Sequence, residues 1–179
     1  MAEDSNKIKN REKNKEKFKE LMLTFHTVMS EIDKIFETRK KEVLEGKIKT
    51  MDHGFKCRKE FLTKVEADAI ASAAKSLNSS LGLVRDRWRV ITLPMPIFVA
   101  MEEGEIAFPK AKLATTLNFS PDDTTSIEAA TRIAQKMIGT DDVEEIKKAV
   151  AEEARVIWNP STAVMDLLFN QATASAPKE

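Results

Sequence analysis

Tyrosine is absent from this chain of 179 residues, and cysteine occurs once, at Cys57. A single cysteine excludes a disulfide framework and a zinc site built from cysteine ligands. Five glycines and six prolines are too few for a collagen-like, linker-rich or barrel-forming sequence. The longest apolar run, residues 90–101, is interrupted by Pro94 and Pro96 and is too short to span a bilayer. With 42% apolar residues, the sequence predicts one ordinary domain, or one domain with an extension.

The formal net charge is zero, but the charges are divided unevenly along the chain. Residues 1–90 carry 21 Lys and Arg against 15 Asp and Glu, whereas residues 91–179 carry 8 against 14. Such asymmetry indicates a polyanion partner for the basic half, or attraction between the two halves or between two copies. The N-terminal residues lack the apolar core of a signal peptide, so we expect a cytoplasmic protein, in the bacterial cytoplasm or nucleoid, with no membrane partner.

Few residues suggest catalysis or metal binding. His26 falls within an apolar helical stripe and His53 in a connector, and no third ligand follows at metal spacing. Cys57 has basic neighbours in the sequence, but no base and orienting partner that a catalytic nucleophile needs can be identified for it. We therefore predict neither an enzyme nor a metal or cofactor site.

A long helix is expected over residues 8–46, where no proline occurs and helix-forming residues dominate. Its apolar residues follow an alternating spacing of four and three, which is a heptad pattern with one charged position at Arg39. The pattern predicts an assembly surface, for a homodimer or for a protein partner. We expect the highly charged residues 7–17 to fray. The predicted oligomerisation residues are Phe18, Met22, Phe25, Met29, Ile32, Phe36 and Val43.

The rest of the chain is also expected to be helical, without strands. Apolar periodicity, turn residues and capping residues predict helices over 55–62, 65–77, 81–92, 94–103, 106–117, 124–138, 143–158 and 162–170. The predicted fold is all-α. Residues 1–50 form a long amphipathic helix for assembly or partner binding, residues 51–171 form a compact helical domain, and residues 172–179 form a disordered tail.

Two helices joined by a short polar turn, over residues 65–92, follow the pattern of a helix-turn-helix. The residues 78–80 read as the turn and supply an N-cap for the second helix. That helix has Trp88 on its apolar side and arginines on its polar side, which is the side a DNA-binding helix turns to the major groove. The candidate DNA-binding residues are Lys75, Ser79, Ser80, Gly82, Arg85, Arg87 and Arg89.

Several short elements between Ile70 and Leu117 occur in a common register without a gap. They are Ala73–Ser80, Val84, Trp88, Leu93-Pro94, Glu103-Gly104-Glu105-Ile106 and Lys110-Ala111-Lys112. In this register they resemble the DNA-binding region of the ParB/KorB family of chromosome- and plasmid-partition proteins. The resemblance implies a ParB-like helix-turn-helix with double-stranded DNA as its partner. The N-terminal nucleotide-binding domain of that family has no counterpart here, so no CTP-driven clamp is predicted.

The sequence therefore predicts a non-enzymatic DNA-binding protein of ParB/KorB-like type, acting in plasmid or chromosome partition or in transcription regulation. An alternative of a different class stays open. The chain would then be a helical adaptor or scaffold whose helix-turn-helix no longer binds DNA and whose long helix recruits a protein. The acidic residues between Glu102 and Glu105, and the absence of a basic residue at Ser79, favour this alternative.

Overall fold

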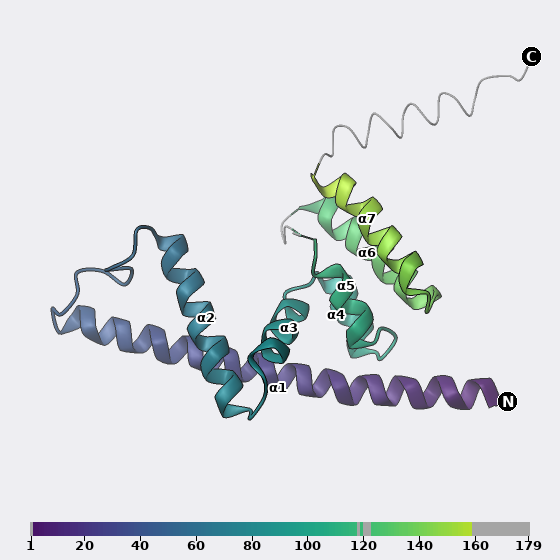
Figure 1. Cartoon of the computed structure of the whole chain (residues 1–179), viewed down its shortest axis with the longest axis horizontal. Helices are drawn as coiled ribbons and strands as arrows, with labels where there is room; N and C mark the ends of the chain where they lie inside the picture. Colours follow the sequence, from purple (N-terminus) through teal and green to yellow (C-terminus); the bar gives the residue numbers. More distant parts are fainter. Residues whose placement is uncertain (1, 118, 120–122, 159–179) are drawn as a thin grey trace, which may run out of the picture. The chain divides into compact units, whose positions relative to one another are not determined.

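The computed structural model describes residues 2–117, 119 and 123–158, with side chains from residue 6 onward (Figure 1). Within that part of the chain it contains seven helices and no strand, which confirms the prediction of an all-α protein with a long N-terminal helix. None of the described helices is long and apolar enough to cross a membrane. The helices are α1 (Ala2–Leu44), α2 (Arg58–Ser76), α3 (Leu81–Ile91), α4 (Met95–Glu102), α5 (Phe108–Ala114), α6 (Thr124–Gly139) and α7 (Val143–Trp158).

The chain divides into two compact units. One unit contains residues up to Phe18 together with those from Thr92 onward, and the other contains Lys19 to Ile91. Helix α1 is continuous across the first of these boundaries, so it supplies residues to both units. The predicted disordered tail at residues 172–179 and the predicted helix at 162–170 lie outside the described residues.

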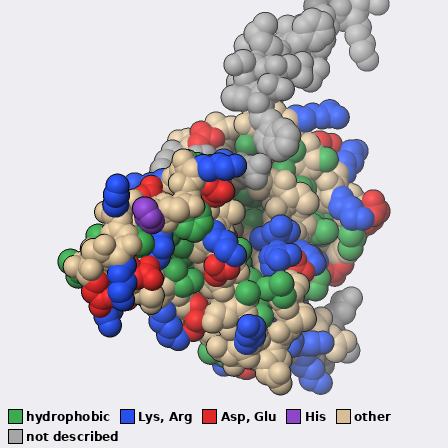
Figure 2. Space-filling model, turned by 60° about the vertical axis from the view of Figure 1, so that its left-hand side comes forward, with side chains coloured by type: hydrophobic (Ala, Val, Ile, Leu, Met, Phe, Trp, Pro, Cys, Tyr) green, Lys and Arg blue, Asp and Glu red, His purple; other side chains and the backbone are tan. Residues whose placement is uncertain are grey.

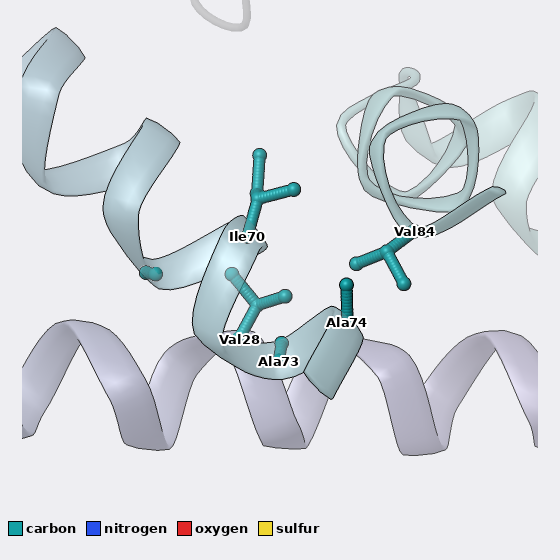
Figure 3. Close-up of a cluster of buried hydrophobic side chains, with 6 residues drawn as sticks. Val28, Ile70, Ala73, Ala74 and Val84 are labelled. Carbon is teal, nitrogen blue, oxygen red and sulfur yellow. The ribbon is translucent and has the colours of Figure 1, made fainter. Parts of the chain in front are cut away.

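In the second unit, α2 and α3 pack on each other and on the middle of α1. Figure 3 shows Val28 of α1 pointing toward Ala73 and Ile70 of α2, while Val84 of α3 faces Ala74. Val28, Ala73 and Val84 are fully buried, and the alanines let the helix backbones approach closely. The core thus combines alanines, which let the helices approach, with larger apolar side chains such as Ile70 and Trp88.

Residues 55–57 do not begin a helix, so the prediction of a separate helix over 55–62 is wrong. Helix α2 starts at Arg58 and continues without a break to Ser76. The connector before it is fastened by Arg39 of α1, which donates hydrogen bonds to the backbone oxygens of Met51 (3.0 Å) and His53 (2.6 Å). The same guanidinium lies over the rings of Phe55 and Phe61. The one charged position of the predicted apolar seam therefore holds this connector.

In the first unit, α6 and α7 lie side by side as a helical hairpin, and α4 and α5 pack against it (Figure 1). Helix α6 is capped at its start by the carboxylate of Asp123, which accepts from the backbone N–H groups of Thr125 and Ser126. At its end, Lys110 of α5 donates to the backbone oxygens of Met137 and Thr140, both at 2.9 Å. Both ends of α6 are thus satisfied by side chains.

The first turns of α1 also belong to this unit, and they are helical from Ala2. Arg11 forms an ion pair with Glu105 (2.6 Å), and the amide of Asn14 donates to the backbone oxygen of Gly104 (2.9 Å). The ring of Phe18 meets that of Phe98 edge-to-face, with centroids 5.1 Å apart. The expectation that residues 7–17 fray is therefore wrong, because contacts about ninety residues away in sequence hold them.

Candidate nucleic-acid interface

The connection between α2 and α3 is four residues long. Backbone hydrogen bonds define the conformation of its first half. The N–H of Asn78 donates to the oxygen of Lys75 (3.1 Å), and the N–H of Ser79 donates to that of Ala74 (2.9 Å). This pair of bonds is the Schellman motif, which needs a left-handed residue after the helix, and Asn78 has φ of +47°. Asparagine tolerates that conformation better than most residues, so the turn is encoded locally.

The second half of the turn caps α3. The hydroxyl of Ser80 accepts a hydrogen bond from the backbone N–H of Leu83 (3.2 Å), which is the geometry of an N-cap serine. The prediction that the residues 78–80 form a turn and supply an N-cap is therefore confirmed. The hydroxyl of Ser79 instead donates back to the backbone oxygen of Leu77 (3.3 Å).

Three residues fix the inner face of α3. Val84 and Val90 are fully buried. Trp88 packs beside the core, stacks on Phe25 at 6.2 Å between ring centroids, and donates its indole N–H to Glu66 (2.6 Å). Trp88 thus anchors α3 by both its apolar body and its polar tip, which sets the rotation of the helix.

The opposite face of α3 is open to solvent. Gly82, Arg85 and Arg89 are all exposed, and a side chain added at Gly82 would meet no atom within 4 Å. Arg85 and Arg89 are one helical turn apart and therefore lie on the same face. Lys75, on the last turn of α2, is also exposed. Six of the seven predicted DNA-binding residues thus lie on α3, on the turn or on the last turn of α2, and Lys75, Arg85 and Arg89 among them are exposed.

A shallow hollow of about 440 Å³ lies beside the turn. Figure 2 shows one face of the molecule, where basic, acidic and apolar side chains are interspersed. The hollow is lined by both apolar and polar residues of α2, the turn and the start of α3. Its lining residues are Ala71, Ala74, Lys75, Asn78, Ser79 and Leu81.

Arg87, the seventh predicted DNA-binding residue, is turned toward α1. It donates to the carboxylate of Glu20 (2.5 Å) and to the hydroxyl of Thr24 (3.3 Å), and its side chain is only 17% exposed. The sequence signal for this contact is the pair Glu20 and Thr24, four residues apart, because they place polar groups beside the apolar stripe of α1. Thr24 is fully buried, which a threonine on a solvated helix face would not be.

Most residues of the predicted oligomerisation seam contact their own chain. Phe25 stacks on Trp88, Phe36 meets Phe61 at 5.8 Å, and Ile32 packs against the buried cluster. Phe18 packs on Phe98, and both residues belong to the first unit. Met22 and Val43 are half-buried, and Met29 is 36% exposed. The apolar periodicity of α1 is thus largely accounted for by α2 and α3.

Within the described residues, no three His, Cys, Asp or Glu side chains are grouped as metal ligands. Cys57 is exposed. Comparison with models of protein families, with curated proteins and with solved structures finds no match to this chain. The chemistry that bears on function lies on the surface formed by α2, the turn and α3.

Proposed function

We propose that this protein binds duplex DNA through the outer face of α3, as a non-enzymatic DNA-binding protein. The observation that carries the proposal is the division of α3 into two faces. Val84, Trp88 and Val90 are directed inward, while Arg85 and Arg89 are exposed on the other side. An α-helix fits the major groove, and arginine is the residue that most often reads guanine there.

The mechanism combines phosphate contacts with base contacts. Lys75 and the backbone N–H groups at the start of α3 would hold phosphates, while Arg85 and Arg89 would reach base edges or phosphates. The helix is eleven residues long, about 16 Å, which is enough for a short footprint. With about three cationic contacts, the logarithm of the binding constant would fall with that of salt at a slope of roughly −2.7. Binding of DNA by one chain is thus expected to be modest. A role in plasmid or chromosome partition or in transcription regulation would need additional protein–DNA contacts.

Fluorescence anisotropy of a labelled duplex at several salt concentrations tests this proposal. Replacing Arg85 and Arg89 by alanine should make the salt slope shallower by about two. Lys148→Ala with Arg155→Ala removes the same charge from exposed positions of α7 and should leave the slope unchanged. Failure of the folded wild-type protein to bind at low salt, or an equal loss in both double variants, would refute binding through α3.

A homodimer formed through α1 is part of the prediction from the sequence, and it can be measured separately. Because Phe25, Ile32 and Phe36 pack within the chain, such a dimer would require this unit to open or would use other side chains. Sedimentation of the full chain over a range of concentrations gives the oligomeric state. A dimer would double the number of α3 helices and raise affinity through avidity.

One observation favours the second candidate function, that of a helical adaptor. Leu81 and Leu83, at the start of α3, are 43% and 38% exposed. Apolar side chains at this place suit a protein partner better than a phosphate backbone. In that case Leu81→Ser would weaken binding of the protein partner. The wild-type protein would not bind DNA, so Arg85→Ala and Arg89→Ala would not change DNA binding.

A further inference from the structure

The positive charge of the first half of the chain is concentrated in one short segment of α1. Residues 7–17, which we call the basic segment, contain six basic and two acidic residues in eleven positions, a net charge of +4. Residues 58–91, which include α2 and α3, are three times as long and carry a net charge of only +3, from seven basic and four acidic residues. The strongest positive charge density of this half therefore lies in the basic segment.

The basic segment is helical, and its contacts with residues 98–105 lie on one face. Arg11 and Asn14 contact Glu105 and the backbone of Gly104, and Phe18, one turn further, packs on Phe98. These three positions are spaced by three and four residues, so they mark one side of the helix. A helix that is already ordered loses little conformational entropy when it binds a partner, whereas a disordered basic tail has to be ordered first.

The side opposite these contacts is open to solvent. Lys9 and Lys13 lie on it, four residues or about 6 Å apart along the axis. Both lysines are exposed, and neither forms an ion pair with another residue in the described part of the chain. The segment's two acidic residues, Glu12 and Glu16, are exposed on the same side, so the excess positive charge comes from the segment as a whole. Lys15 and Glu12, which are also in the segment, have their charged atoms 3.9 Å apart with both side chains largely exposed, so this pair neutralises the surface only weakly.

We propose that the basic segment is a second DNA-binding surface, which holds the phosphate backbone of a duplex through Lys9, Lys13 and their basic neighbours. It rests on the charge and packing of α1 and does not require α3 to bind DNA. Phosphates spaced along a strand suit lysines that repeat at four-residue intervals, because each lysine can act as a separate point charge.

The composition of the segment favours nucleic acid over the other anionic partners. Membrane binding needs an apolar face to insert, and the only large apolar side chain between residues 7 and 17 is Ile8. Lysine binds phosphate as a point charge and needs no bidentate geometry, which suits a phosphate backbone. The segment has five lysines and one arginine, and that arginine, Arg11, is already paired with Glu105.

The test uses the full chain and a fluorescent duplex of about 20 base pairs, because that length spans two turns of the double helix. Lys9→Gln with Lys13→Gln should reduce the salt slope by about two and weaken binding on the order of tenfold to a hundredfold at 0.1 M salt. Glutamine has nearly the helix propensity of lysine, so the helical content measured by circular dichroism should not change. Lys40→Gln with Lys41→Gln removes the same charge from exposed positions near the end of α1 and should bind as the wild type does.

Comparison with the Arg85→Ala and Arg89→Ala variant separates the two surfaces. If only the Lys9 and Lys13 changes weaken binding, the basic segment is supported and binding through α3 is overturned. If only the arginine changes weaken it, the basic segment is overturned and α3 is supported. Equal losses from the Lys9/Lys13 and Lys40/Lys41 pairs, or retention on vesicles containing phosphatidylserine without retention of DNA, would also overturn the proposal for the basic segment.

Discussion

Replacing Gly104 by alanine is expected to detach the start of α1 from its own unit. Gly104 ends α4 in a second Schellman motif: its N–H donates to Met101 (3.0 Å), and the N–H of Glu105 donates to Ala100 (2.8 Å). Its φ is +76°, and a β-carbon built on it would lie 2.5 Å from the backbone oxygen of Arg11. Alanine at this position is thus opposed both by its backbone conformation and by a neighbouring main chain.

The two costs can be estimated separately. The left-handed conformation costs a non-glycine residue about 1–2 kcal/mol. Relieving an overpacked contact typically costs a further 1–3 kcal/mol, and here a backbone atom has to move rather than the end of a side chain. The lower entropy of the unfolded alanine chain returns about 0.4–1 kcal/mol. The free energy of unfolding should therefore fall by roughly 2–4 kcal/mol.

Gly46 and Gly54 are matched controls for the conformational cost. Their φ values are +70° and +89°, and a β-carbon on either would meet nothing within 4 Å. Gly46→Ala should thus lower the free energy of unfolding by only about 1 kcal/mol in urea titrations. Amide hydrogen exchange of residues 7–17 should quicken in Gly104→Ala and stay unchanged in Gly46→Ala. Equal losses in the two variants, with protected residues 7–17, would show that the contact with Arg11 does not hold α1.

Three further predictions concern the second unit. Asn78→Gly should leave stability within about 0.5 kcal/mol of wild type in thermal unfolding, whereas Asn78→Val should lower it by about 1–2 kcal/mol; equal stabilities would contradict the role of the left-handed turn. Glu20→Gln should weaken the hold of α1 on Arg87. If α3 binds DNA, the salt slope of binding should then become steeper by up to about one, and an unchanged slope would mean that Arg87 reaches no phosphate. Hydrogen bonds from Lys34, and then from Ser72, hold the pKa of the Glu31 carboxyl below its usual range. The ionised carboxylate therefore stabilises the fold above the usual glutamate pKa, and this stabilisation is lost as the pH falls through the lowered pKa. Glu31→Gln should therefore lower stability near neutral pH and flatten the acid limb of a stability–pH curve, and parallel curves would rule this out.

The elements that depend on local sequence could be predicted, and those that depend on distant contacts could not. The start of α7 at Val143 follows from periodicity and from the capping residues before it. The turn at Asn78 and the cap at Ser80 follow from residue types that favour those backbone conformations. By contrast, the order of residues 7–17 comes from Gly104 and Glu105, which no local pattern links to them.

The candidate site shows the same limit. Periodicity identifies the apolar stripe of α1 but not the surface that covers it, so Phe25 and Phe36 read equally well as a dimer seam or as the wall of the chain's own core. From the sequence, Arg87 is one of three arginines expected on the polar side of the second helix. In the structure it differs from Arg85 and Arg89 because it forms an ion pair with Glu20 of α1. Assigning Arg87 to its partners requires the tertiary arrangement, because Glu20 and Thr24 are more than sixty residues away in the sequence.

Helix α1 has a thermodynamic consequence because it belongs to both compact units. Extending an existing helix costs far less than nucleating a new one, so each unit, while folded, serves as a template for the turns that the other unit uses. Melting one unit should therefore lower the melting temperature of the other. A ligand that tightens either end of α1 should be detectable as slower amide exchange beyond Lys19 as well as before Phe18.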